Sequence, residues 1–194
     1  MLNALNRKWT LTLTQNGGVS EDALVYGEGF ISSPPILLVG EAPGAQETLQ
    51  KRPFVGQAGK NLDRFLQVAE LPREDIYITN LVKVRPTKAE SSGRRSNRPP
   101  NRGEIQAFLP WLLEECALIA PKLVVTLGNS ALQAFLGRDA IIGNLHGSII
   151  ERGTGAPLFA LYHPAAIIYN RALADIYQED LQKLRAYVKQ MPKN

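Results

Sequence analysis

Several side chains that could bind or transform a ligand follow short apolar runs in this sequence. Asn80 ends the run YITN, His163 precedes a proline in LYHPAA, and glycines 40 and 44 flank the carboxylate-containing turn GEAPG. An asparagine amide offers a donor and an acceptor, which suits a base edge or an amide, and a histidine can donate a hydrogen bond or act as an acid. Glycines let the backbone approach a ligand closely, so the N–H groups of this turn can hold an anionic oxygen.

Each of these residues also has an ordinary structural interpretation. A glycine-rich turn between a strand and a helix is common, and Glu47 would then support the start of the helix. Asn80 would cap the turn after its own strand, and a lone histidine is usually structural. Phe54, in KRPFVG, fits either the core or a position where it stacks on a base. A functional interpretation therefore requires that these residues come together in space.

The apolar pattern predicts alternating strands and helices. Four buried strands are expected at residues 36–40, 75–80, 122–128 and 157–164, and four helices at residues 59–70, 103–120, 129–137 and 174–190. This alternation predicts an α/β fold, a three-layer α/β/α sandwich with a central, mainly parallel four-stranded sheet. We expect residues 1–30 to be irregular, and no linker divides residues 1–194.

The carboxyl ends of parallel strands share one edge of a sheet, and ligands bind in the crevice outside that edge. The segments that follow the predicted strands are GEAPGAQE, Asn80, Gly128-Asn129-Ser130 and Tyr162-His163-Pro164. The predicted topology thus places the polar side chains in a single cleft, which favours the functional interpretation.

Charge is distributed unevenly along the chain. The net charge is +4 and the pI is about 9.3, but residues 83–102 hold seven basic side chains against Glu90 alone. Such a segment either attracts a polyanion or is a solvated, disordered loop. The single cysteine, Cys116, excludes an intramolecular disulfide and a site built on several thiolates, and we expect it to be a buried small hydrophobe. With neither a signal peptide nor a membrane span apparent, a cytoplasmic protein is expected.

Five segments occur in the order and at the spacing of a known family: GEAPGAQE, RPFVGQAGKNLD, YITNLVKVRP, KLVVTLG and YHPAA. On these residues, and on VYGEG before the first strand, the chain resembles the uracil-DNA glycosylase superfamily, closest to its family 4. The resemblance spans residues 25–194. It implies a monomeric DNA repair enzyme that flips uracil out of DNA and hydrolyses the bond between base and deoxyribose.

The resemblance also assigns roles in the base pocket. Phe54 would stack on the flipped base, and Asn80 would accept from N3–H and donate to O4. His163 would hydrogen-bond O2 and stabilise the negative charge on the departing base, helped by backbone N–H groups of the turn at Ala42.

Further roles concern water and DNA. Glu41 is the first candidate for positioning water and countering an oxocarbenium-like sugar, and Glu47 is the second. Ile167, Ile168 or Tyr169 would wedge into the gap left by the flipped base. The residues expected to contact DNA are Lys83, Arg85, Gly128, Asn129, Ser130, Pro164, Ala165, Ile167, Ile168, Tyr169 and Arg171.

The chain departs from family 4 at three places, one of which is the segment after Pro164, where AAIIYNR replaces the commoner AYLLR. That family is known for a four-iron, four-sulfur cluster on four cysteines, whereas the corresponding positions here are Val84 and residues near Thr12, Gln15 and Phe108. We therefore expect no cluster and no metal, with packing in its place.

Another departure is the basic loop of residues 87–102, which is longer than the usual RPPGNRxP connection. It would either supply extra DNA contacts or be disordered. Two alternatives to uracil excision stay open: excision of another deaminated base, such as hypoxanthine or xanthine, and DNA binding without catalysis.

Overall fold

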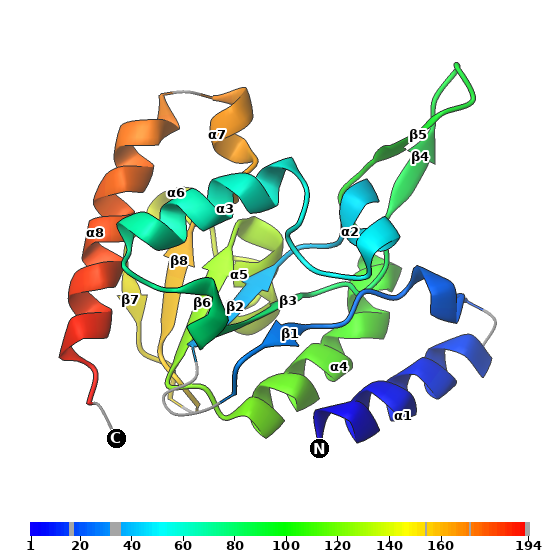
Figure 1. Ribbon diagram of the computed structural model, residues 1–194, viewed down its shortest axis with the longest axis horizontal. Helices are drawn as coiled ribbons and strands as arrows, with labels where there is room; N and C mark the ends of the chain where they lie inside the picture. The colour runs from blue at the N-terminus through cyan, green and yellow to red at the C-terminus, as the bar shows by residue number, and fades with distance from the viewer. Residues whose placement is uncertain (16–17, 32–35, 154, 171, 193–194) are drawn as a thin grey trace.

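The computed structural model describes residues 1–15, 18–31, 36–153, 155–170 and 172–192. The elements of the first half of the chain are α1 (Leu2–Gln15), η1 (Glu21–Ala23), β1 (Glu28–Gly29), β2 (Ile36–Gly40), α2 (Ala45–Gln50), α3 (Gln57–Val68), η2 (Arg73–Asp75), β3 (Ile76–Asn80), β4 (Thr87–Ala89) and β5 (Arg95–Asn97). Those of the second half are α4 (Arg102–Ile119), β6 (Leu123–Leu127), α5 (Asn129–Leu136), α6 (Ile142–Leu145), β7 (Ile149–Ile150), β8 (Leu158–Leu161), α7 (Ala166–Tyr169) and α8 (Leu173–Gln190). Figure 1 shows their arrangement.

The central sheet has the strand order β1-β3-β2-β6-β8-β7. Its four inner strands are parallel and are the four strands predicted from the sequence, whereas β1 and β7 pair antiparallel at the two edges. The edge strands were not predicted because each has two residues, too few for an alternating pattern. In this register Gly40 lies opposite Asn80, so the predicted polar segments do end at a common edge.

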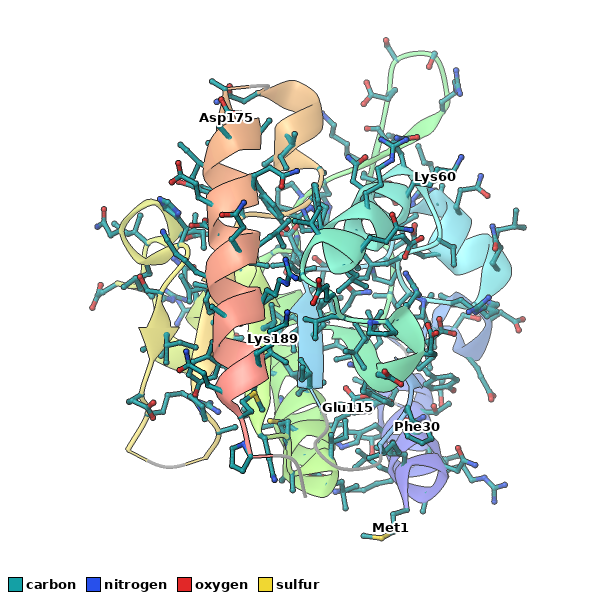
Figure 2. The ribbon with its side chains drawn as sticks, turned by 60° about the vertical axis from the view of Figure 1, so that its left-hand side comes forward. Met1, Phe30, Lys60, Glu115, Asp175 and Lys189 are labelled. Carbon is teal, nitrogen blue, oxygen red and sulfur yellow. The ribbon has the colours of Figure 1, made fainter. Side chains whose placement is uncertain are left out.

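Both faces of the sheet are covered, which confirms the three-layer architecture. Side chains alternate along β2: Leu38 packs in a cluster that includes Leu62 of α3 and Leu181 of α8, whereas Leu37 packs with Trp111 of α4. Helix α8 runs the length of one flank, with Asp175 and Lys189 near its two ends (Figure 2). In the described parts of the chain, no helix is both long and apolar enough to cross a membrane.

The expectation that residues 1–30 are irregular is wrong for the helix α1. This helix packs on α4: the rings of Trp9 and Trp111 stack with centroids 6.3 Å apart, and Lys8 and Trp9 donate hydrogen bonds to Glu114. Leu5 is buried in the same interface. The helical spacing of Leu2, Leu5 and Trp9 was a usable signal, but intervening polar residues hid it.

A buried ion pair fixes the end of β3. The amino group of Lys83 donates to Glu115 Oε2 at 2.6 Å, to Thr79 Oγ1 at 2.5 Å and to the backbone oxygen of Asn80 at 2.7 Å. Glu115 also accepts hydrogen bonds from Tyr77 and Thr79. Burial lowers the pKa of Lys83, and the Glu115 carboxylate opposes this effect. Lys83 is 0% exposed, so the expectation that it contacts DNA is wrong.

Removing one partner of this ion pair should destabilise the fold strongly. We expect Lys83→Met to lower the free energy of unfolding by about 3–5 kcal/mol, because Glu115 is left buried without its cation. Lys83→Met combined with Glu115→Gln should recover part of the loss, since the amide still accepts a hydrogen bond but has no charge. Urea denaturation measures both variants, and a double variant less stable than Lys83→Met would contradict this account.

Candidate active site at the carboxyl edge of the sheet

A cavity of about 290 Å³ lies at the carboxyl edge of the sheet, close to the lower end of the range of ligand pockets. It is lined by Ala42, Gly44, Ala45, Gln46, Glu47, Phe54, Gly56, Gln57, Ala58, Asn80, Asn97, His163 and Ala165. Five of the six residues predicted for catalysis and base binding therefore meet in one place. The exception is Glu41, which is not among the lining residues.

Gly40 explains how the residues of the pocket come so close together. A Cβ atom at this position would lie 2.4 Å from Asn80 Oδ1 and 2.4 Å from the ring of Phe54. Neither neighbour can withdraw easily, because Asn80 is 3% exposed and Phe54 is 5% exposed. The last residue of β2 thus has to be a glycine for the amide and the ring to flank the same space.

Phe54 is held in an unusual backbone conformation. Its φ angle is +52°, a region that residues other than glycine seldom occupy. Arg73 donates to the backbone oxygens of Pro53 at 2.7 Å and Phe54 at 3.1 Å, and a Cβ at Gly59 would lie 1.9 Å from the Phe54 oxygen. The surrounding contacts therefore maintain the strained loop that places the ring in the pocket.

Glu47 connects the glycine turn to the Phe54 loop. Its carboxylate accepts backbone hydrogen bonds from Gly44 at 3.1 Å, Val55 at 2.9 Å and Gly56 at 2.7 Å. Through the bond from the N-cap residue Gly44 it supports the start of α2, and it is 8% exposed. The structural role predicted for Glu47 at a helix start is thus confirmed, while one face of the residue also lines the cavity.

His163 is present as the neutral imidazole at neutral pH. Its Nδ1 accepts a hydrogen bond from the Ala165 backbone N–H at 3.1 Å, which leaves the ring proton on Nε2. Burial lowers the pKa of His163 to about 4, although the Glu47 carboxylate acts in the opposite direction. Its ring centroid lies 6.0 Å from that of Phe54. The pocket therefore contains a neutral N–H donor close to an aromatic face.

Asn97 is a pocket residue that the sequence interpretation missed. It is the last residue of β5 and its Oδ1 accepts from Arg85 Nε at 2.7 Å, while a Cβ at Gly44 would lie 3.5 Å from its Nδ2. The composition of residues 87–102 predicts a basic loop, and in such a loop a single amide gives no sign of a place in the pocket. A signal for Asn97 was available, because the connection RPPGNRxP of family 4 contains an asparagine followed by an arginine, as Asn97 and Arg98 are here. Arg85, expected to contact DNA, is engaged here with Asn97.

The residues around the start of α5 make internal contacts. Ser130 donates a hydrogen bond to Glu41 Oε2 at 2.5 Å, and Asn129 Oδ1 accepts from the backbone N–H of Ile142 at 2.9 Å. Gly128 has a φ of +86°, and a Cβ there would lie 3.1 Å from His163 Cβ. These contacts orient Glu41 and allow His163 to approach; the predicted DNA contacts of residues 128–130 stay predictions.

The segment after His163 is described in part. Pro164 is buried, and its backbone oxygen accepts from Asn61 at 3.3 Å, whereas Ala165 lines the pocket. Ile167 packs against the core cluster under α8, which leaves less of it available as a wedge. Ile168 and Tyr169 belong to α7, but their side chains, like Arg171 as a whole, lie outside the described residues.

The positions that correspond to the cluster ligands of family 4 hold side chains that do not fit a metal cluster. Phe108 is 2% exposed and its ring lies 6.2 Å from that of Trp111, and Val84 packs in the same apolar cluster. Thr12 is exposed on α1. Among the residues that the structure describes, no three His, Cys, Asp or Glu side chains are placed to bind a metal ion. Cys116 also packs against this cluster, and burial raises the pKa of its thiol.

The two carboxylates should respond differently to neutralisation. We expect Glu47→Gln to lower the free energy of unfolding by about 1–3 kcal/mol, because an NH₂ group would replace an oxygen that accepts backbone hydrogen bonds. Glu41→Gln is the matched control, since its amide oxygen can still accept from Ser130, and should change stability by less than about 0.5 kcal/mol. Urea denaturation tests the pair, and equal losses would contradict the assignment.

The pKa of His163 also predicts a pH dependence. Between about pH 6.5, its ordinary value, and pH 4, the unfolded chain binds a proton that the folded chain does not. His163 therefore reduces stability as the pH falls through this window, by at most about 3 kcal/mol. We expect His163→Asn to lose less stability than the unaltered protein between pH 7 and pH 4.5. Identical losses in urea denaturation would show that the pKa is not lowered.

Comparison with known proteins agrees with this geometry. The model of the family described as "Uracil DNA glycosylase superfamily" matches residues 27–189. The chain is 38% identical over 164 residues to the type-4 uracil-DNA glycosylase of Pyrobaculum aerophilum, covering 81% of this chain and 79% of the relative. It is 36% identical over 169 residues to that of Thermotoga maritima, covering 86% and 83%.

A solved structure shows the same fold at low identity. The crystal structure of wild-type Pedobacter heparinus SMUG2 matches with a TM-score of 0.53 at 13% identity, covering 80% of this chain and 74% of the other. The family match extends from β1 to the last turn of α8 and includes every residue that lines the pocket. The chain therefore belongs to the uracil-DNA glycosylase superfamily.

Proposed function

We propose that this protein is a DNA repair glycosylase that extrudes uracil from DNA and hydrolyses its N-glycosidic bond, leaving an abasic site. One observation supports this function above the others: Phe54, Asn80 and His163, from three separate segments, line the same cavity. An aromatic face, an amide and a neutral N–H donor are the groups that recognition of a planar, uncharged base requires. The relatives named type-4 uracil-DNA glycosylase support the choice of uracil.

The amide of Asn80 would provide selectivity for uracil. Its oxygen would accept from N3–H of the base and its NH₂ group would donate to O4, while the Phe54 ring stacks on the base plane. Cytosine has an amino group at position 4 and no proton on N3. The NH₂ group of Asn80 would then face another donor, and its oxygen would face another acceptor. Asn80 is 3% exposed, and a buried polar group left without its partner disfavours the wrong ligand strongly.

His163 would stabilise the leaving group. The proton on Nε2 is available because Nδ1 already accepts from Ala165, and a pKa of about 4 keeps the ring neutral at physiological pH. The neutral ring would donate to O2 of uracil as the bond to deoxyribose breaks and negative charge develops there. One preorganised donor of this type typically contributes about 3 kcal/mol to the stability of a transition state.

Glu41 would position the attacking water and counter the positive charge on the sugar, with Glu47 as the second candidate. The hydrogen bond from Ser130 fixes one oxygen of Glu41. Glu47 faces the cavity, but both of its oxygens accept backbone hydrogen bonds, which favours a positioning role. This contrast supports the order Glu41 before Glu47.

We also infer that a single copy of the chain acts on DNA in the cytoplasm. The residues assigned a role in base recognition line one cavity within a single copy of the chain, which supports this inference. The wedge would come from α7, beside the cavity, through Ile167, Ile168 or Tyr169.

Base-release analysis tests the proposed function. Oligonucleotides that contain uracil, hypoxanthine or xanthine, single-stranded or paired, are incubated with the protein, and free base is quantified. We expect release of uracil and an alkali-labile abasic site. Release of hypoxanthine or xanthine without uracil would contradict the assigned substrate, and tight DNA binding without any product would contradict catalysis.

Single-turnover rates test the assigned residues. Asn80→Ala and His163→Ala should each lower the rate by about 10²–10³-fold, since each removes a donor to the base. Glu41→Gln should lower it by about 10²-fold without loss of stability. Asn144→Ala, on the exposed helix α6, is the control and should leave the rate unchanged. Unaltered rates in the two alanine variants of the pocket would overturn the role assignment.

A further inference from the structure

Residues 87–97 form a β-hairpin, which we call the basic hairpin, where the sequence left a disordered loop possible. Strands β4 and β5 pair from Thr87 opposite Asn97 to Ala89 opposite Arg95. In both views the hairpin projects from the body, and in Figure 1 the hairpin and α7 both lie at the top of the molecule, at its right and left. Its base is braced, because Arg98 donates to the Thr87 backbone oxygen and forms two 2.7 Å hydrogen bonds to Glu104. The hairpin is therefore a projecting arm with a fixed base.

The structure accounts for three of the seven basic residues in this region. Lys83 is buried against Glu115, Arg85 is bound to Asn97, and Arg98 is paired with Glu104. Four basic residues stay exposed: Lys88, Arg94, Arg95 and Arg102. Three of these belong to the hairpin, where Glu90 is the single acid and lies 3.8 Å from Lys88. The exposed charge of the arm is thus predominantly positive.

The two faces of the hairpin differ in their relation to the pocket. Side chains alternate along a strand, so Arg95 and Asn97 share one face of β5, whereas Lys88 and Ser96 are opposite each other on the other face. Asn97 lines the pocket, which places Arg95 on the pocket side, about 7 Å farther along the strand. Arg95 Nε donates to Thr87 Oγ1, while its two terminal nitrogens have no partner among the described residues. They can therefore bind an oxyanion.

We propose that the basic hairpin is a DNA-binding arm, and that Arg95 binds a backbone phosphate next to the extruded nucleotide. This inference rests on the proposed function for the position of the DNA. A guanidinium matches a phosphate with paired N–H donors. The hydrogen bond from Arg95 Nε to Thr87, the partner of Asn97 across the hairpin, directs this guanidinium toward the pocket end of the hairpin. The arm would hold the strand beside the cavity while the wedge segment near α7 holds it at another point.

The experiment compares two variants that remove one charge each from the same hairpin. Arg95→Gln acts on the pocket side, and Lys88→Gln, on the opposite face, is the matched control. Fluorescence anisotropy gives the Kd for a duplex with a tetrahydrofuran abasic-site analogue between 50 and 200 mM salt. Arg95→Gln should weaken binding about tenfold and reduce the salt slope by about 1, with less than a twofold change for Lys88→Gln.

The outcomes separate this inference from the proposed function. Equal effects of the two variants would show a general effect of charge and overturn the proposal, as would wild-type affinity in Arg95→Gln. Lys88→Gln should leave the single-turnover rate on uracil-containing DNA within twofold of that of the unaltered protein, because Lys88 lies on the hairpin face away from the pocket. Absence of base release by the unaltered protein would contradict the proposed function but leave the binding comparison valid.

Discussion

The buried pair of Lys83 and Glu115 is the interaction on which the pocket depends. Asn80 is the last residue of β3, where the sheet no longer fixes the backbone through pairing on both sides. The three protons of Lys83 reach Glu115, Thr79 and the Asn80 oxygen, so the charge is fully satisfied while it ties this strand end to α4. Such a network defines a single geometry when it is complete and is costly when one member is missing.

Close backbone approaches around this fixed point bring the other groups together. Gly40 leaves room for Asn80 and Phe54, and Gly128 leaves room for His163. Arg73 donates a hydrogen bond to the backbone oxygen of Phe54 and so holds the loop in the conformation with a positive φ angle. Catalysis by preorganised groups requires this rigidity, because donors that must reorient during the reaction contribute less.

The sequence predicted the four parallel strands and their common edge because buried strands produce clear apolar runs. It located Phe54, Asn80 and His163 by residue type and by resemblance. It misassigned Lys83 because a charge in a basic segment gives no sign of a buried partner 32 residues away in the sequence. Asn97 was missed for a similar reason, since only the pairing of β4 with β5 places it at the pocket.

The segment from Val84 to Phe108 shows how packing can take over the anchoring of a loop. Its ends lie at two positions where the resemblance to family 4 implies thiolate ligands, and here both ends pack in the same apolar cluster. The Arg98–Glu104 pair then braces the chain between them. The segment is thus held at both ends and at an internal point. Because Asn97 is next to Arg98, the internal point also keeps Asn97 at the pocket wall while the rest of the hairpin projects. Hydrophobic burial of the two ends, together with the Arg98–Glu104 ion pair, therefore joins the pocket to the exposed arm in this chain.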